Sequence, residues 1–396
     1  MNILILPSWY TMPENPISGI FFKEQAQALQ SYFDRFDKGS RVFVLAVEAF
    51  SVRALRTFFK RKGFVFADED GIPTARTRFM NIPKAGRLNY MLCGKRLAHC
   101  LRKFQKQLGI GFDLVHVHSA LDAGIWYAHS GLRLPYVITE HASAYSRGLV
   151  TAGQKRCLPQ VFDNASRIIA VGNGLVAELH KYTKKPVEVI FNIVAPFFSV
   201  PQGNVRKSEA FTFFSLGVNA RKKGFDILLS AFSDYIMRGN SGRLIIAGLT
   251  EAEKQWLLSF TPSHKVMQHL ELRGKLGRDE VMQEMACCDC FVLVSRHETF
   301  GVVFAEAMYC GKPVIASRTG GPDSFVNEEN GILVHTEHVD ETAAALAAMR
   351  SEYSRYDAGK IRAYAEAQFS PDVICGKLKS VYDSIVVDGG GGIVIL

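Results

Sequence analysis

Short apolar runs alternate along the chain with segments in which apolar residues recur every three or four positions. The runs are typical of buried strands, and the spacing between them is typical of helices that cover a sheet. Because this alternation continues along the chain, it predicts parallel sheets of the doubly wound α/β class. The expected strands include 2–6, 41–47, 113–119, one ending at 139–141, 167–171, 187–191, 211–216, 243–247, 270–273, 291–294, 313–316 and 332–334.

The alternation is interrupted near residues 192–208, where turn-forming and charged residues replace the apolar runs. We therefore expect a first Rossmann-like domain at 1–195 and a second at 209–368. A closing helix at 369–388 is expected to return to the first domain. Two such domains leave a cleft that faces the carboxyl ends of their strands, where ligands of α/β sheets bind.

Composition and length fit a globular protein, because 48% of the 396 residues are apolar. No apolar run is long enough to cross a bilayer, and the opening MNILILPSWY lacks the basic start and cleavage site of a signal peptide. Of eight scattered cysteines, Cys287, Cys288 and Cys290 cluster, but no second ligand pair follows at zinc-like spacing. We expect reduced thiols and a cytoplasmic protein.

Charge is distributed unevenly along the chain, whose formal net charge is +9. No Asp or Glu occurs between Gly71 and Phe112, whereas cations accumulate there: Arg76, Arg78, Lys84, Arg87, Lys95, Arg96, Arg102, Lys103 and Lys106. Apolar residues at helical spacing from Leu97 to Leu108 predict a helix that buries them and exposes its cations. These cations form either an ordinary solvated face or a surface that attracts an anionic membrane or acceptor.

The stretch from Ser295 to Gly321 carries the clearest chemical pattern. It predicts a turn after a buried strand and then a helix at 302–309, with Glu298 in the turn and Glu306 two helical turns further on. The amides of residues 299–301 would lie at the positive end of this helix and suit a pyrophosphate. Glu306 can accept both hydroxyls of a sugar diol, and Glu298 can accept from neutral hydroxyls. The alternative is a capped surface helix with two solvated acids.

A second pattern is the turn GVNARKKG at 217–224, which follows the first strand of the second domain. A diphosphate leaving group needs its growing negative charge met by a metal or by fixed cations and amides. Asp68 and Asp70 precede Gly71 and are better explained by an exposed hairpin turn than by a metal site. Arg221 and Lys223 are therefore the candidate phosphate cations, and a solvated basic turn is the alternative.

Histidines occur at the carboxyl ends of two neighbouring strands in the first domain. His118 lies near the carboxyl end of the strand at 113–119, and His141 ends the next strand. A lone histidine is usually a structural imidazole, but two at the ligand-binding edge of one sheet favour a functional interpretation.

These motifs together resemble the retaining nucleotide-sugar glycosyltransferases of family 4, which have two facing Rossmann-like domains in the GT-B arrangement. The resemblance covers nearly the whole chain and is most specific in the second domain. It rests on Glu298-Thr299-Phe300-Gly301 with Glu306, Gly311-Lys312-Pro313-Val314-Ile315 followed by Gly320-Gly321, Lys223-Gly224-Phe225-Asp226, Arg273-Gly274, Gly19, the His118 strand and Phe369-Ser370.

The resemblance implies how a nucleotide sugar is held. Glu306 looks like the ribose-binding carboxylate, and Glu298 looks like the acid beside the hydroxyls of the donor sugar. The backbone at Lys275 and Leu276 would hold the base. His118 is similar to the histidine that approaches the donor sugar.

The resemblance also implies a diphosphate site. The amides of Thr299, Phe300 and Gly301 would lie near sugar and diphosphate, Lys223 would bind the diphosphate, and Gly19 would let the first loop approach it. The arginine that often follows the first glycine of this turn is Val218 here. Either Arg221 replaces that arginine, or Lys223 neutralises the phosphate alone.

The activity implied is metal-independent, retaining transfer of a hexose from a UDP- or GDP-sugar to an acceptor hydroxyl, without a further cofactor. The acceptor would be a bacterial surface polysaccharide or a lipid-linked sugar at the inner face of the membrane. One alternative is a sugar-nucleotide epimerase or hydrolase on the same fold. Another is a non-catalytic basic protein that binds membranes or nucleic acid, although we expect no nucleic-acid partner. A dinucleotide oxidoreductase is disfavoured because no G-x-G-x-x-G follows either first strand.

Overall fold

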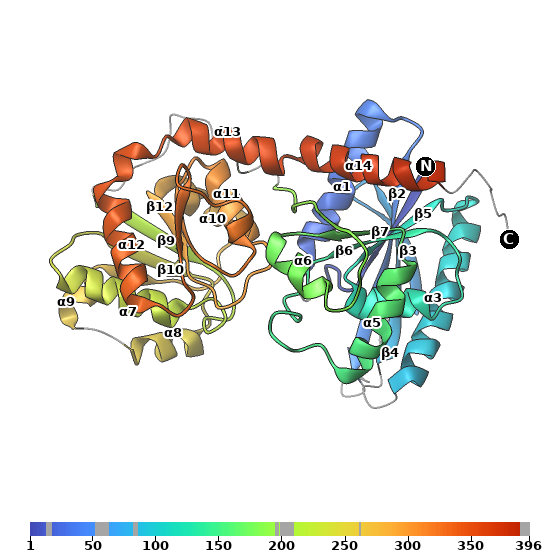
Figure 1. The fold of residues 1–396 in the computed structure, drawn as a ribbon, viewed down its shortest axis with the longest axis horizontal. Helices are drawn as coiled ribbons and strands as arrows, with labels where there is room; N and C mark the ends of the chain where they lie inside the picture. Colours follow the sequence, from blue (N-terminus) through green and yellow to red (C-terminus); the bar gives the residue numbers. More distant parts are fainter. Residues whose placement is uncertain are drawn as a thin grey trace. The chain divides into compact units, whose positions relative to one another are not determined.

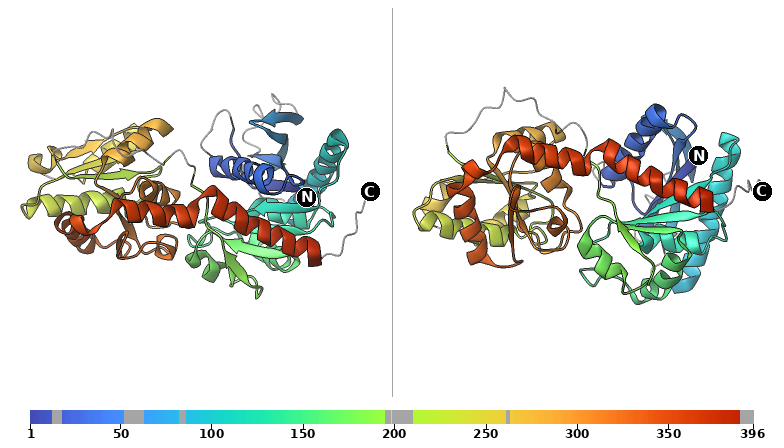
Figure 2. Two further views of the ribbon diagram at one scale, coloured as in Figure 1. Left: turned by 90° about the horizontal axis from the view of Figure 1, so that it is seen from above. Right: turned by 45° about the horizontal axis from the view of Figure 1, so that its top comes forward.

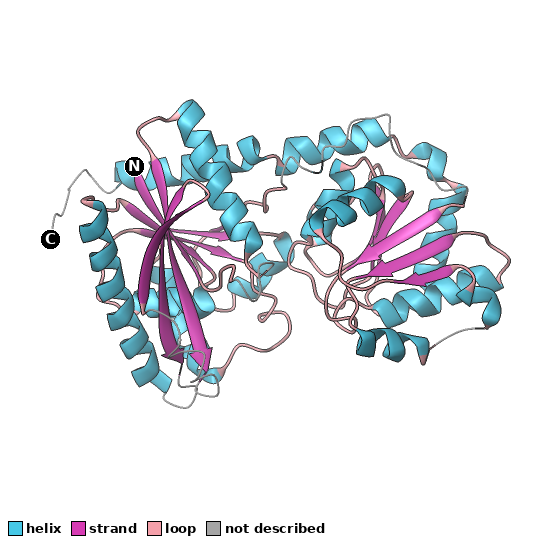
Figure 3. Ribbon diagram, turned by 180° about the vertical axis from the view of Figure 1, so that it is seen from behind, coloured by secondary structure: helices cyan, strands magenta, loops and turns pink. Residues whose placement is uncertain are grey.

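The structure is a computed structural model that describes residues 1–12, 18–51, 63–81, 86–194, 198, 210–260 and 263–388. The chain forms two compact units. The first unit contains Met1–Val171, Leu175–Ile193 and the C-terminal segment from Pro371, and the second contains Gly172–Gly174 and Val194–Ser370. In each unit, helices cover both faces of a sheet (Figures 1 and 3). The predicted α/β class with two Rossmann-like sheets is confirmed.

The sheet of the first unit has the strand order β3-β4-β2-β1-β5-β6-β7-β8. Its strands are parallel except for the hairpin of β3 and β4. The strands are β1 (Asn2–Pro7), β2 (Arg41–Ser51), β3 (Phe64–Glu69), β4 (Ile72–Asn81), β5 (Leu114–His118), β6 (Tyr136–Glu140), β7 (Arg167–Ala170) and β8 (Val187–Val189). The helices are α1 (Ile20–Phe36), α3 (Gly86–Leu108), η3 (Ala120–Gly124), α4 (Ile125–Ala128), α5 (Ala152–Asn164), α6 (Asn173–Leu179) and α14 (Pro371–Asp388).

The hairpin of β3 and β4 tests the interpretation of Asp68 and Asp70. Asp70 and Gly71 have positive φ angles, and the Gly71 N–H donates to Asp68 Oδ1 over 2.8 Å. The exposed hairpin turn predicted for these acids is confirmed, and Asp70 pairs with Lys23 rather than with a second acid. The hairpin also extends the sheet, because β4 pairs with β2 in parallel from Thr74 onward.

The segment after β5 is helical but irregular, because the π-helical η3 comes before the short α4. Acceptors from outside the segment explain this irregularity. The Ala120 N–H donates to Glu140 over 2.8 Å, and the Ala123 N–H donates to the Ser8 hydroxyl over 3.0 Å. These contacts replace the regular helical pattern in the first turn.

Helix α14 packs along α1 and completes the core of the first unit (Figure 2). Its buried side chains join those of α1 and of the sheet: Ile374, Cys375, Leu378, Val381, Tyr382 and Ile385. Ion pairs of Arg35 with Asp372 and of Lys379 with Asp37 flank this apolar contact. The last segment of the sequence before residue 389 is therefore an integral part of the first unit.

The sheet of the second unit is parallel throughout, with the order β11-β10-β9-β12-β13-β14. The strands are β9 (Thr212–Leu216), β10 (Arg243–Ala247), β11 (Leu270–Leu272), β12 (Cys290–Leu293), β13 (Val314–Ser317) and β14 (Gly331–Val334). The helices are α7 (Phe225–Met237), α8 (Glu251–Leu258), α9 (His264–Met267), α10 (Arg278–Cys287), α11 (Val302–Tyr309), α12 (Val339–Ser351), α13 (Ala358–Phe369), and the short η5 (Pro322–Ser324) and η6 (Tyr353–Arg355). Helix α11 confirms the helix predicted at 302–309.

The strand order of the second unit reverses between β9 and β12. From β9 the chain proceeds to β10 and β11 on one side, and β12 then starts the other side. A crevice forms at the carboxyl ends of the strands where the order reverses, and it is the usual ligand site of such sheets. The loops after β9 and β12 are the turn at 217–224 and the loop at 294–301, which contain the candidate phosphate and sugar residues.

No helix among the described residues is both long and apolar enough to span a membrane. Most of the linker expected near 192–208 and the final residues 389–396 lie outside the described part of the chain.

Candidate functional site

The switch point of the second unit brings a cation and a carboxylate together. Lys223 Nζ lies 2.6 Å from Glu298 Oε2, and the two side chains are only 14% and 12% exposed. Gly217 makes room for this arrangement, because a Cβ at that position would lie 2.8 Å from Lys223 Cγ. The Lys223 side chain therefore packs against Gly217 of the same turn, and its Nζ contacts the loop after β12.

This ion pair joins two residues that the sequence assigned to different parts of one ligand. An ammonium group has three donors, so the bond to Glu298 leaves Lys223 with capacity for an anion as well. Glu298 in turn is neutralised by its neighbour, which removes part of the repulsion expected between a carboxylate and a diphosphate. The pair can therefore bind a sugar hydroxyl and a phosphate next to each other.

The loop from Glu298 to Gly301 presents its backbone and hides most of its side chains. Phe300 is buried against Phe325 and Phe369. Gly301 is the N-cap residue of α11, and its φ of 88° lies in the left-handed region that favours glycine. The predicted contribution of residues 299–301 through their amides is compatible with this geometry, because the Phe300 side chain is part of the core.

The turn after β13, which contains Gly320 and Gly321, packs against this loop. A Cβ at Gly321 would lie 2.8 Å from the Phe300 nitrogen and 2.8 Å from the Glu298 carbonyl oxygen. The absence of a side chain thus lets the turn after β13 pack directly on the backbone of the loop. This contact explains physically why a glycine at position 321 accompanies Glu298 and Gly301 in the sequence.

Helix α11 fixes the position of Glu306. The neighbouring residues Ala305, Ala307 and Met308 are buried, whereas Glu306 is partly exposed. The helix begins at Val302, so Glu306 lies a little more than one turn inside it. Glu298 and Glu306 thus come from one continuous loop and helix, and Glu298 is the carboxylate that lies 2.6 Å from Lys223 Nζ.

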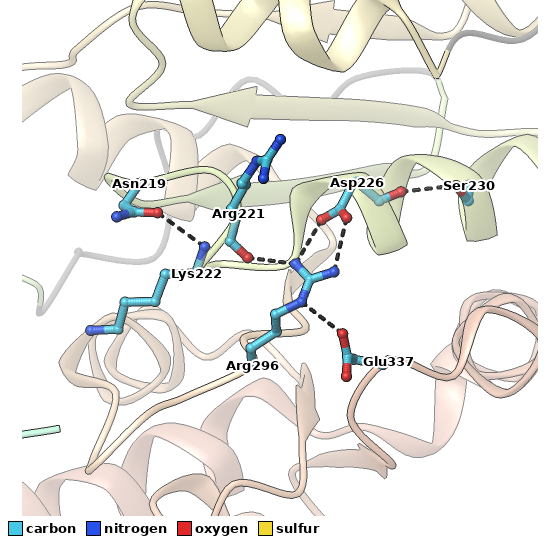
Figure 4. A network of polar contacts seen from close by, with 7 residues as sticks. All are labelled: Asn219, Arg221, Lys222, Asp226, Ser230, Arg296 and Glu337. Atoms are coloured by element: carbon cyan, nitrogen blue, oxygen red, sulfur yellow. Dashed lines mark hydrogen bonds and ion pairs between the residues drawn. The ribbon is translucent and has the colours of Figure 1, made fainter. Parts of the chain in front are cut away.

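Arg296, which our sequence analysis did not single out, ties three loops of the second unit together (Figure 4). Its guanidinium donates to both carboxylate oxygens of Asp226 over 2.9 Å and to Glu337 Oε1 over 2.9 Å. It also donates to the Arg221 carbonyl oxygen over 2.5 Å, and the Arg296 N–H donates to the Lys222 carbonyl. The hydrogen bonds with Asp226 raise the pKa of Arg296 above its ordinary value.

The Arg296 network therefore holds the turn that carries Lys223 against the loop that carries Glu298. Glu337 has a positive φ of 63°, a conformation that costs energy for a residue with a side chain. A sequence signal for Arg296 did exist, because it follows a buried strand and stands two residues before Glu298. Its partners were not predictable, since Asp226 and Glu337 are 70 and 41 residues away.

We expect Arg296→Lys to lower the catalytic activity of this site by roughly tenfold to a hundredfold, because small displacements of reacting groups have effects of this size. Lysine keeps the charge but cannot form the two parallel bonds to Asp226. Arg238→Lys is the matched control, because Arg238 and its partner Asp340 are exposed and 3.8 Å apart. Steady-state kinetics of both variants provide the measurement, and equal activity of Arg296→Lys and the parent would contradict a positioning role.

The Arg221 guanidinium packs on an aromatic ring. It lies over the ring of Trp256 on α8, 5.0 Å from the ring centroid, and Figure 4 shows it directed away from the Arg296 network. Arg221 contributes its carbonyl oxygen to that network instead. Phosphate binding by its side chain stays a prediction that needs a different side-chain conformation, and Val218 beside it is exposed.

The segment expected to hold a base lies next to the end of β10. The Gly248 N–H donates to the Gly274 carbonyl over 2.9 Å, and the Leu249 N–H donates to the Arg273 carbonyl over 3.2 Å. Lys275 is exposed and Leu276 is partly exposed just beyond these bonds. The backbone at Lys275 and Leu276 is thereby held at the carboxyl edge of the same sheet as Lys223.

In the first unit, His118 and His141 lie together, as expected for residues at the ends of neighbouring strands. His118 Nδ1 is 3.0 Å from His141 Nε2, and Phe22 of α1 packs on both rings. Among the described residues, none forms a hydrogen bond with His118 Nε2. A buried imidazole nitrogen of this kind is costly unless a ligand hydroxyl or water reaches it.

Burial keeps these histidines neutral. It lowers the pKa of His141 to about 3 and the pKa of His118 well below its ordinary value. His116 on the same strand has a pKa of about 3 for the same reason, and it bonds Tyr382 of α14 and Thr139 over 2.7 Å each. His118 is therefore suited to exchange a hydrogen bond with a neutral hydroxyl rather than to carry a positive charge.

A buried glutamate shapes the loops around the histidines. The Glu140 carboxylate accepts from the backbone of Ala120, His141 and Ala142 and from the Tyr145 hydroxyl, over 2.8 to 2.9 Å. Burial raises the pKa of Glu140, and the backbone hydrogen bonds oppose this shift. Glu140 thus fixes the segments that follow β5 and β6.

Gly19 caps α1 with a φ of 74°, three residues before Phe22. A Cβ there would lie 3.0 Å from the Trp9 carbonyl oxygen, so glycine allows this close packing of the first loop. Residues 13–17 lie outside the described part of the chain. The approach of Gly19 to a phosphate stays a prediction.

Within the described ranges, no group of three or more histidine, cysteine, aspartate or glutamate side chains is arranged to hold a metal ion. Cys288 and Cys290 are buried, and their sulfurs approach backbone carbonyls of Met285 and Phe291.

Comparisons with known proteins show which sequences the chain resembles. The family described as "Glycosyl transferases group 1" matches residues 199–366, and the family described as "Glycosyltransferase Family 4" matches residues 48–196. The putative teichuronic acid biosynthesis glycosyltransferase TuaC of Bacillus subtilis is 25% identical over 373 residues, which are 87% of this chain and 88% of TuaC. An uncharacterized glycosyltransferase of Methanocaldococcus jannaschii is 30% identical over 226 residues, which span 56% of this chain but only 61% of that protein.

Solved structures show the same fold. Sucrose-phosphate synthase from Thermosynechococcus elongatus has a TM-score of 0.74 at 16% identity, with 98% of this chain and 100% of that chain covered. HepE from Anabaena in complex with UDP has a TM-score of 0.71 at 20% identity, with 97% and 100% covered.

Proposed function

The chain belongs to the family 4 glycosyltransferases, and we propose that it moves a hexose from a UDP- or GDP-sugar to an acceptor hydroxyl with retention of configuration. The observation that carries this proposal is the Lys223–Glu298 pair at the switch point, beside the start of α11 and upstream of Glu306. One cation, one carboxylate and a helix N-terminus are the groups that a sugar diphosphate requires.

The donor would be bound by groups of the second unit. Lys223 and the amides of residues 299–301 would bind the diphosphate, Glu306 the ribose diol, and Glu298 the hydroxyls of the sugar. The backbone near Lys275 would hold the base. Lys223 would then share its N–H groups between Glu298 and the phosphate. Binding of the nucleotide sugar would therefore weaken the ion pair without leaving either group unpaired.

The proposed chemistry needs no nucleophile from the protein. The bond between the anomeric carbon and the diphosphate oxygen breaks, and that oxygen takes the electron pair. The acceptor hydroxyl loses its proton to a phosphate oxygen and bonds to the anomeric carbon on the same face. Lys223 and the loop amides stabilise the charge that develops on the diphosphate, which is the largest stabilisation that fixed groups can supply.

The relatives support a nucleotide-sugar donor and a lipid-linked or polysaccharide acceptor. HepE has been solved with UDP and with UDP-glucose. A protein of Corynebacterium glutamicum, 27% identical over 172 residues, is named as a GDP-mannose-dependent mannosyltransferase of monoacylated phosphatidylinositol monomannoside. For this chain we propose a glycolipid or surface polysaccharide acceptor at the inner face of a membrane.

A thermal-shift screen with nucleoside diphosphates and nucleotide sugars tests the donor. We expect one base to raise the unfolding temperature most, because ligands that bind the folded state stabilise it by mass action. The absence of stabilisation by any of them would overturn the proposal. Turnover of the donor at full rate without any acceptor would instead favour the epimerase or hydrolase alternative.

We further expect transfer to continue in EDTA at the rate measured without it. Lys223 and the amides after Glu298 supply the positive charge that a divalent metal provides in other transferases. The measurement is the initial rate with the identified donor, before and after chelation. Loss of most activity that added Mg²⁺ or Mn²⁺ restores would contradict metal independence.

A further inference from the structure

Helix α3 of the first unit presents a continuous exposed stripe that no part of the proposed chemistry uses. Residues at alternating four- and three-residue spacing define it: Leu88, Leu92, Lys95, His99, Arg102 and Lys106. At 3.6 residues per turn, these positions fall within roughly 80° of one another around the helix axis. We call this stripe, together with the adjacent Met91, the α3 face.

The α3 face divides into an apolar end and a cationic end. Leu88, Met91 and Leu92 are 60%, 40% and 53% exposed at the start of the helix. The charged residues that follow on the stripe, Lys95, Arg102 and Lys106, are exposed cations. No acidic residue occurs in the sequence from Gly71 to Phe112, so α3 itself contains no acid to neutralise them.

The other side of α3 anchors it firmly. Cys93, Leu97, Leu101 and Phe104 are buried against the first unit. Gly94 packs so closely that a Cβ there would lie 2.5 Å from the carbonyl carbon of His129. The α3 face is therefore presented by a fixed helix at the outside of the first unit (Figure 1), and burial of its leucines cannot be achieved by rotating the helix inward.

The mixture of side chains points to one kind of partner. A soluble polyanion would pair with the cations but would leave two leucines and a methionine in water. The boundary between headgroups and acyl chains of an anionic bilayer accepts both kinds of group, because apolar side chains enter it and cations remain at the phosphates. Cations near such a surface add attraction that salt screens.

We propose that the α3 face docks on the surface of an anionic lipid bilayer, with Leu88, Met91 and Leu92 inserted and Lys95, Arg102 and Lys106 at the lipid phosphates. This inference rests on the proposed function for its purpose, because a lipid-linked acceptor is reached from such a surface. Its physical basis, however, is the charge and exposure of α3, which do not depend on the donor site.

Sedimentation with lipid vesicles tests the docking surface. The full-length protein is mixed with vesicles of phosphatidylcholine alone or of phosphatidylcholine with an equal amount of phosphatidylglycerol. We expect binding to the anionic vesicles, little binding to the neutral vesicles, and progressive release as salt is added. Equal binding to both, or binding to neither, would overturn the proposal.

Two variants separate the apolar and cationic contributions. Leu88→Gln with Leu92→Gln is expected to weaken binding to anionic vesicles about tenfold or more, because two side chains no longer leave water. Lys95→Glu with Lys106→Glu is expected to abolish the preference for anionic vesicles. Met237→Gln and Lys265→Glu are the matched controls, because they change an exposed methionine on α7 and an exposed lysine on α9.

Two further readouts keep the outcomes distinct. The first readout is retention on a heparin column. If the parent and the leucine variant are retained equally and neither binds vesicles, the α3 face would be assigned to a soluble polyanion and membrane docking would be overturned. Nucleotide-induced thermal shifts are measured on all variants and should be unchanged. If the parent binds anionic vesicles but shows no nucleotide-induced shift, the proposed function fails while the docking proposal stands.

Discussion

Replacing Glu306 by alanine should weaken the binding of the preferred nucleoside diphosphate by on the order of a hundredfold or more. The carboxylate is proposed to accept hydrogen bonds from both ribose hydroxyls, and a hydrogen bond to a charged group contributes about 1.5–3 kcal/mol. Because 1.4 kcal/mol corresponds to roughly a factor of ten, the loss of two such bonds exceeds a hundredfold. Helix α11 should survive the change, since its buried side chains are Phe304, Ala305, Ala307, Met308 and Tyr309.

Titration calorimetry with UDP and GDP measures this effect directly. Glu306→Gln should bind with intermediate affinity, because its amide oxygen still accepts one hydrogen bond without the charge. Glu366→Ala on the neighbouring helix α13 is the matched control, since Glu366 is an exposed glutamate outside the proposed site. If Glu306→Ala bound both nucleotides as well as the parent and the control, the ribose assignment would be wrong.

The fold was largely predictable from the sequence because it depends on patterns that are local. A buried strand such as β12 is a short apolar run, and α11 begins where the polar turn ends, so its bounds at Val302 and Tyr309 could be predicted. The parallel sheets follow from the alternation of strands and helices. The π-helical turn at Ala120–Gly124 was not predictable, because Glu140 and Ser8, which are distant in the sequence, supply its outside acceptors.

The composition of the candidate site was also predictable, but its internal contacts were not. Glu298 and Lys223 could each be assigned from a motif, whereas their ion pair joins residues 75 positions apart. Charge repulsion alone would keep the Glu298 carboxylate away from a diphosphate. The structure shows a cation already beside it, so sugar and phosphate groups can share one small region.

The two units differ in how firmly their geometry supports a role for their candidate residues. In the second unit, Arg296 and Gly321 hold the loops of Lys223 and Glu298 in contact with each other. In the first unit, His118 is buried, neutral and in contact with His141, but its Nε2 still needs a hydrogen-bond partner. The position of Lys223 is therefore the stronger basis for a quantitative prediction about catalysis.

Replacing Lys223 by alanine should lower kcat by about a hundredfold to a thousandfold, the size of effect seen when one fixed group is removed from a developing negative charge. A second consequence adds to this loss. Without Lys223, the nearly buried Glu298 carboxylate keeps its charge close to the proposed diphosphate, so the repulsion that the ion pair removes would return. We therefore expect Lys223→Ala to be impaired more severely than Lys223→Ala combined with Glu298→Gln at the diphosphate-binding step.

Lys222→Ala is the matched control, because it removes the same charge from the same turn. The Lys222 side chain extends away from the Arg296 network in Figure 4, while its backbone N–H donates to Asn219 over 3.1 Å. Kinetics of the two single variants and the double variant, with unfolding temperatures measured in parallel, separate catalysis from stability. An equal fall of kcat in Lys222→Ala and Lys223→Ala would mean that the net charge of the turn matters, and not the contact between Lys223 and Glu298. A fall in Lys223→Ala alone, with its unfolding temperature close to that of the parent, would locate the leaving-group cation at Lys223 Nζ.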